Sequence, residues 1–259
     1  MWNVIYALFF RELKTRFGKN RRLGYIWLVS EPMAQIVLIT SILSLIREYQ
    51  HQIMPSGMSA FMFLAVGIIP FFMFRSIVKQ LLEGIKSNIG LFIYKPIKPI
   101  HVFIARTLLE TCIYFFIFVV LMFIAGWFFD LVVLPAHFLE FYLSFLLLFL
   151  SGFALGLCLS ILNHLVDVLK SIIPYVTIIL YLASAVIYPS WILPKELFNI
   201  LLFNPWFHIM ESLKAGYFDN YPIKDEITLL YPLCVSILLL YVGLWFYYYK
   251  RQELAAERQ

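Results

Sequence analysis

The chain has 259 residues, of which 63% are hydrophobic and only 14% are charged. A water-soluble domain carries roughly 25% charged and 45–50% apolar residues, and a folded chain of this size still exposes a large surface. The composition therefore excludes a water-soluble globular protein and predicts an all-α integral membrane protein. The net charge of +5 comes from blocks of Lys and Arg between apolar runs. Such blocks are typical of membrane topology, so no nucleic-acid partner is expected.

Residues 1–22 are predicted to form a basic amphipathic helix. Ile5, Phe9, Leu13 and Phe17 recur every four positions, which places them on one face of a helix. The basic residues fall on other faces, an arrangement suited to a helix lying in the cytoplasmic interface of the membrane. A plain juxtamembrane tail is the alternative.

Six apolar stretches approach or exceed the roughly 20 residues that a helix needs to cross a bilayer. They are 25–46, 59–81, 105–127, 138–162, 171–189 and 228–249. The second contains Gly67 and Pro70 and reaches Arg75 and Lys79, so we expect its end to snorkel or to kink. The chain is thus predicted to be one domain, 1–259, with a six-span bundle at 25–249 and a cytoplasmic tail at 250–259.

Lys and Arg are distributed unevenly between the two sides of these spans. Of the 20 such residues, only Arg47, Lys195, Lys214 and Lys224 lie on one side, and the other 16 lie on the opposite side. The positive-inside rule places the larger set in the cytoplasm. Both termini are then cytoplasmic, as an even number of spans also requires.

Two links between spans carry further structure. In the cytoplasmic link, Pro96 and Pro99 stop any helix, and residues 84–92 before them fit a short helix that a soluble partner could push, or an ordinary loop. The external link, 189–226, is apolar but is divided by Pro194 and Pro205. It is predicted to form two short re-entrant helices that dip into the outer leaflet.

Small residues recur every four positions in the fourth stretch, at Ser151 or Gly152, Gly156 and Ser160. Such spacing allows close helix packing, which we expect to lie inside one protomer.

The sequence lacks the motifs of catalysis and of energy conversion. There is no phosphate-binding loop, no H-E-x-x-H zinc motif and no G-x-S-x-G nucleophile, so no catalytic residue, metal or cofactor is expected on this chain. The acidic residues in or near the spans are Glu31, Glu110 and Glu140, none at mid-depth, and Glu110 is spaced to pair with Arg106. An ion-coupled transporter is disfavoured, and a subunit driven by another protein is predicted.

Several motifs carry a family resemblance. They are Arg11-Glu12-Leu13-Lys14-Thr15-Arg16-Phe17, Leu23-Gly24-Tyr25-Ile26-Trp27, Glu31-Pro32, Asn88 with Lys95-Pro96, Tyr188-Pro189, and Asn204-Pro205. In this order they resemble the permease subunits of type-2 ABC exporters, and more narrowly those that export capsular and other cell-surface polysaccharides. One departure is the run Asn163–Asp167, where only Asp167 matches the family's Arg-x-Arg-Asp pattern.

The resemblance implies a homodimer in the bacterial inner membrane, bound to two copies of a separate ATPase subunit that holds ATP and Mg. Periplasmic export proteins are further expected partners. The N-terminal helix and the Glu83–His101 link would receive the ATPase motion. The candidate coupling residues are Arg11, Lys14, Arg16, Glu83, Lys86, Asn88, Tyr94, Lys95 and Asp167.

The resemblance also implies that spans one and five line a pore at the dimer axis. A polymer longer than the membrane is thick must thread such a pore, where aromatic rings can cover the C–H faces of sugars and cations would suit an acidic polymer. The candidates are Tyr25, Trp27, Arg47, Lys170, Tyr175, Tyr181 and Tyr188. Aromatic contact with lipid is the alternative for each ring.

Two other functions remain open. The same architecture would suit a lipid-linked O-antigen, a teichoic acid or a small amphiphile. A membrane enzyme acting on lipid-linked sugars would need clustered acidic groups, for which Asp219, Asp225 and Glu226 are the nearest approach. Solvated loop charges explain these three residues better.

Overall fold

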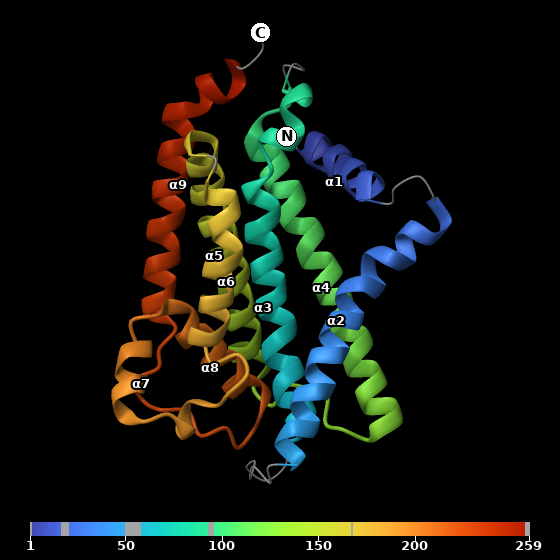
Figure 1. Ribbon diagram of the computed structural model, residues 1–259, viewed down its shortest axis with the longest axis vertical. Helices are drawn as coiled ribbons and strands as arrows, with labels where there is room; N and C mark the ends of the chain where they lie inside the picture. The colour runs from blue at the N-terminus through green and yellow to red at the C-terminus, as the bar shows by residue number, and fades with distance from the viewer. Residues whose placement is uncertain (1, 17–20, 50–57, 93–95, 167, 257–259) are drawn as a thin grey trace.

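The computed structural model describes residues 2–16, 21–49, 58–92, 96–166 and 168–256 (Figure 1). Within these ranges the chain is helical, with no β-strand. The six predicted spans correspond to α2 (Arg21–Tyr49), α3 (Ala60–Leu82), α4 (Pro99–Phe129), α5 (Phe138–Leu165), α6 (Leu169–Ala183) and α9 (Leu230–Ala256). All except α6 are long and apolar enough to cross a membrane. The predicted all-α fold is therefore confirmed for the described residues.

One predicted boundary is wrong. The fifth stretch was expected to be helical to residue 189, but α6 ends at Ala183, because the backbone turns at Ala185, which has a left-handed φ of 52°. Helix α9 continues to Ala256 and so includes much of the predicted tail at 250–259.

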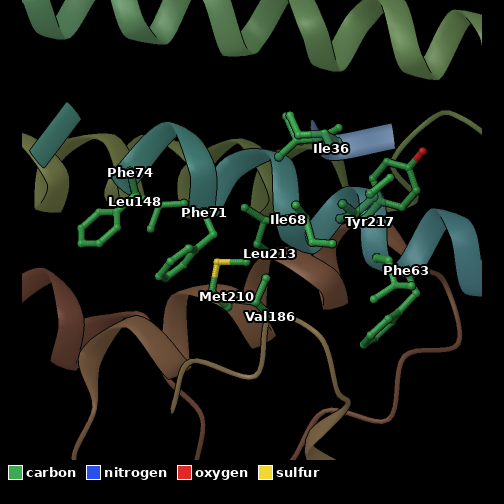
Figure 2. Packing of buried hydrophobic residues seen from close by; sticks show 14 of the residues in the cluster. Ile36, Phe63, Ile68, Phe71, Phe74, Leu148, Val186, Met210, Leu213 and Tyr217 are labelled. Carbon is green, nitrogen blue, oxygen red and sulfur yellow. The ribbon is translucent and has the colours of Figure 1, made fainter. Parts of the chain in front are cut away.

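Helix α3 forms the centre of the bundle, and α2, α4, α5 and α8 (Pro205–Tyr217) pack around it. Figure 2 shows this core, in which Phe63, Phe71 and Phe74 of α3 are fully buried near Leu213 of α8. Although Pro70 lies inside α3, the helix is continuous.

The small residues of α5 pack inside the protomer, as predicted. A Cβ atom added to Gly152 would lie 3.2 Å from the Phe74 ring, and one added to Gly156 would lie 3.0 Å from Leu81 Cβ. Both neighbours belong to α3, so the glycines allow α3 and α5 to approach closely.

The remaining elements gather at the two ends of the bundle (Figure 1). At one end lie α1 (Trp2–Arg16), the 3₁₀ helix η1 (Lys86–Leu91) and the C-terminal part of α9. At the other lie α7 (Lys195–Leu201) and α8, preceded by η2 (Ser190–Ile192). We call these the α1 end and the α8 end.

The outward faces of the long helices are apolar. Exposed side chains on α4 and α9 include Phe116, Phe123, Trp127, Leu238 and Trp245. A soluble protein rarely leaves so many large apolar side chains in contact with water, so these faces are suited to lipid.

Candidate functional site

At the α1 end, a polar network joins the two elements that the sequence predicts to contact an ATPase. Arg11 Nη1 of α1 donates a hydrogen bond to Asn88 Oδ1 of η1 at 3.0 Å. Asn88 is buried, and its Nδ2 donates to Gly84 O at 3.0 Å and to Ser87 Oγ at 3.2 Å. The N-terminal helix is therefore bonded directly to the 3₁₀ helix.

A buried ion pair reinforces this junction. Arg106 Nε of α4 lies 3.2 Å from Glu12 Oε2 of α1, and both side chains are almost fully buried. Arg106 also donates to Gln80 O of α3 at 2.8 Å and to Ser87 Oγ of η1 at 2.9 Å. We call Arg11, Glu12, Ser87, Asn88 and Arg106 the α1–η1 cluster. It links four helices at one point.

The other predicted coupling residues lie around this cluster. Glu83 pairs with Lys170 of α6 at 3.1 Å, while Lys14 and Lys86 are exposed on α1 and η1. Arg16 ends α1, but its side chain is not described. Tyr94, Lys95 and Asp167 lie outside the described residues.

Two adjoining hollows run along α3 beside α2 and α6. The larger, about 440 Å³, is apolar apart from Arg75, and is lined by Ile39, Ile42, Leu43, Phe72, Arg75, Ile178, Tyr181 and Ile187. The smaller, about 250 Å³, lies nearer the α1 end and is lined by Arg75, Lys79, Leu82, Glu83, Lys170, Ile173, Pro174 and Thr177. Because both share Arg75, we treat them as one surface, the α2–α6 groove.

Two of the predicted path residues, Lys170 and Tyr181, line the α2–α6 groove. Trp27 on α2 is 68% exposed and Tyr175 on α6 is 70% exposed, so both rings face outward from the protomer. The Tyr25 side chain lies outside the described set.

The two remaining path candidates lie toward the α8 end. Arg47 is almost buried, with its guanidinium carbon 5.0 Å from the centre of the Phe63 ring. Tyr188 is half-buried and donates a hydrogen bond to Leu182 O at 2.6 Å, which ties it to the end of α6.

A buried charged group at the α8 end was not predicted from the sequence, in which Lys214 was counted only as an external charge. Lys214 and Glu211 are fully buried on α8, with Nζ and Oε1 3.4 Å apart, and Tyr221 donates to Glu211 Oε1 at 2.9 Å. Lys214 Nζ also lies 4.3 Å from the centre of the Phe63 ring. Burial, opposed by the Glu211 carboxylate, lowers the pKa of the Lys214 ammonium to about 8. The i,i+3 spacing of the pair was the signal available in the sequence.

These side chains hold the segment that follows α6. Lys214 Nζ donates to Ala185 O and lies 3.4 Å from Tyr188 O. Asn204 Nδ2 donates to Ala183 O at 3.0 Å, while its Oδ1 accepts from Trp206 N at 3.1 Å and so caps α8. The Asn-Pro motif therefore both starts α8 and satisfies a carbonyl that the end of α6 leaves free.

The acidic residues that a membrane enzyme would need are dispersed. Asp219 is exposed and lies 4.0 Å from His137 Nε2, and Asp225 and Glu226 are exposed. In the described part of the chain, no group of three His, Cys, Asp or Glu side chains is arranged to hold a metal ion. The arrangement suits solvated loop charges.

Comparison with known proteins agrees with the motifs. The family described as ABC-2 type transporter matches residues 3–218. The chain is 34% identical to the polysialic acid transport protein KpsM of Escherichia coli, over 94% of this chain and 92% of that protein. It is 27% identical to the capsule polysaccharide export inner-membrane protein CtrC of Neisseria meningitidis, over 92% of this chain and 87% of that protein.

Proposed function

Because this chain belongs to the ABC-2 type transporter family, we propose that it is the permease subunit of an ATP-driven exporter that moves a capsular polysaccharide across the bacterial inner membrane. The observation that carries the proposal is its similarity, over nearly the whole chain, to two proteins whose names specify polysialic acid transport and capsule polysaccharide export. The family resemblance predicted from the motifs is thereby confirmed.

In this proposal the chain crosses the membrane six times, with the α1 end in the cytoplasm. Helix α6, with 15 residues, is about 22 Å long, shorter than the roughly 30 Å hydrocarbon layer. The short helices α7 and α8 then complete the outer side of the bundle as re-entrant elements. The position of α1 and the end of α9 at the same end of the bundle supports an even number of crossings.

The α1–η1 cluster is the proposed receiver of the ATPase stroke. A soluble ATPase that binds two ATP and Mg between its copies would press on η1 and α1 from the cytoplasm. Arg106 bonds η1 and α1 to α4 and to the end of α3. A push on η1 would therefore move two long helices rather than bend a loop.

The pore would form between two copies of this chain. A two-fold axis brings the same face of each protomer together. The faces of α2 and α6 are candidates, because both expose large apolar side chains and they border the α2–α6 groove. A polymer could thread between the paired grooves, with Trp27 and Tyr175 available to cover sugar faces.

The experiment is deletion of the gene in its own bacterium, with measurement of polysaccharide on the surface and inside the cell. We expect surface polymer to disappear, intracellular polymer to accumulate, and the wild-type gene to restore export. The tagged chain should co-purify with an ATPase and, reconstituted without it, should move nothing. A deletion strain with normal surface polysaccharide would refute the proposal.

A further inference from the structure

We propose that Arg75 binds an anionic group of the exported polymer, a sugar carboxylate or the phosphate of a terminal lipid, as the polymer passes along the α2–α6 groove. The inference rests on the proposed export function. It adds the charge of the cargo and names the residue that recognises it.

Arg75 lies inside α3 rather than at its end. Arg75 lies 15 residues after the start of α3 and 7 residues before its end at Leu82, about 10 Å from the α1 end of that helix. In the proposed topology this depth places the Cα atom of Arg75 within the hydrocarbon layer. A charged side chain there is costly and, where it occurs, marks a substrate or ion pathway.

Arg75 has no counter-ion among the described residues of the protomer. Arg75 makes no ion pair or hydrogen bond with the part of the chain that the structure describes. Two carboxylates at this side of α3 have other partners, since Glu110 of α4 accepts from Ser76 Oγ at 2.5 Å and Glu83 pairs with Lys170 at 3.1 Å. The guanidinium is therefore available to an anion from outside the protomer.

The two hollows of the α2–α6 groove meet at Arg75. Arg75 is the one residue that lines both hollows of the groove. The charged residues that line the hollow toward the α1 end are three cations, Arg75, Lys79 and Lys170, and one anion, Glu83. The formal charge of the lining is therefore +2. Clustered charge of one sign in a cleft raises the local concentration of the opposite ion. An anionic chain entering from the cytoplasm would meet this charge first.

The line of cations continues outward. Tyr181, on the far side of Arg75 in the groove, lies within electrostatic reach of both Arg75 and Arg47. Lys79 and Lys170, then Arg75, thus form a series along the groove, and Arg47 lies beyond them, buried with its guanidinium carbon 5.0 Å from the centre of the Phe63 ring. A guanidinium can bind a carboxylate or phosphate through two parallel hydrogen bonds, which suits Arg75 to the central step.

The first test is made in cells that lack the chromosomal gene. Arg75→Gln should lower the ratio of surface to retained polymer by about tenfold, the loss expected for one charge-assisted contact. Arg75→Lys, which keeps the charge but not the paired hydrogen bonds, should restore part of it, and Lys79→Gln should have a smaller effect of the same sign. Lys195→Gln, which removes an exposed cation on α7, should export normally.

The second test measures binding to the purified permease–ATPase complex. The probes are polymer extracted from the same cells, that polymer with its carboxylates chemically reduced, and that polymer with any terminal lipid removed. Arg75→Gln should weaken binding of native polymer. If reduction of the carboxylates abolishes the difference between variant and wild type, the polymer supplies the anion, and if lipid removal abolishes it, a lipid headgroup does.

Specific results would overturn the proposal. Wild-type export and binding by Arg75→Gln would do so, as would an equal loss of binding for native, reduced and lipid-free polymer. Dissociation of the homodimer by Arg75→Gln would instead assign the guanidinium to a second copy of this chain. A melting curve of the complex for each variant separates misfolding from these outcomes, because a variant that melts like wild type is folded. If gene deletion itself leaves export normal, the proposed function fails rather than the role of Arg75.

Discussion

Arg106 Nε lies 3.2 Å from Glu12 Oε2, so a buried ion pair between residues 94 positions apart ties the N-terminal helix to α4. The same guanidinium donates to Gln80 O and to Ser87 Oγ. Arg106 therefore connects four helices at the α1 end. Without it, the Glu12 carboxylate would lose its counter-charge, whereas Gln80 O and Ser87 Oγ would each lose a hydrogen bond.

Arg106→Met should lower the free energy of unfolding by about 3–5 kcal/mol, because it leaves the Glu12 carboxylate buried without its counter-charge. Glu12→Gln should cost less, since Arg106 keeps its bonds to Gln80 O and Ser87. Thermal melting of the purified permease–ATPase complex should rank the variants in that order below wild type. Asn3→Ala, at an exposed position on α1, is the control, and equal melting of Arg106→Met and Asn3→Ala would contradict the expectation.

Arg11→Gln should affect coupling more than stability. Its single described hydrogen bond, to Asn88 Oδ1, is part-buried, so the loss in stability should be about 1 kcal/mol. If α1 and η1 transmit the stroke together, polymer exported per ATP hydrolysed should fall while ATP hydrolysis continues. Parallel assays of surface polymer and of ATPase activity measure this ratio, and an unchanged ratio would remove Arg11 from the coupling path.

Much of the fold was predictable because lipid imposes a simple rule on length and polarity. The helices α2, α3, α4, α5 and α9 each contain a long apolar run, and hydrophobic length alone identifies such runs. The early end of α6 was not predictable in this way. It depends on Lys214 and Asn204, which bind carbonyls at its C-terminal end from positions 20 or more residues further along the chain.

The same contrast applies to the candidate site. Spacing rules connect residues one turn apart, and so indicated Glu110 as a partner for Arg106, but they cannot indicate Glu12, which lies on α1, 94 positions before Arg106 of α4. The family resemblance indicated Arg11 and Asn88 as coupling candidates, and the structure joins them by a hydrogen bond at the α1 end. The groove around Arg75 needed three helices in place before it could be recognised.

Lys214→Met should be among the most destabilising substitutions in this chain. It would leave Glu211 buried with Tyr221 as its remaining described partner, and would free the Ala185 carbonyl. The expected loss is about 3–5 kcal/mol. Replacing both charges, as Lys214→Met with Glu211→Leu, should recover part of it, because no uncompensated charge remains. Melting temperatures of the two variants decide the matter, and a double variant less stable than Lys214→Met would show that the pair is not the cause.

Gly67→Ala tests whether α3 must approach the end of α6 closely. A Cβ atom at position 67 would lie 2.6 Å from Val186 O. The neighbour is a backbone atom next to the turn at Ala185, and it has no rotamer by which to move away, so overpacking should cost about 1–3 kcal/mol. Gly90→Ala is the matched control, since nothing lies within 4 Å of the added Cβ, and its melting temperature should stay close to that of wild type.

Because the clash moves the α6 end that borders the α2–α6 groove, Gly67→Ala should also lower surface polymer. If Gly67→Ala melts and exports like Gly90→Ala, the close approach of α3 to Val186 does not hold the end of α6.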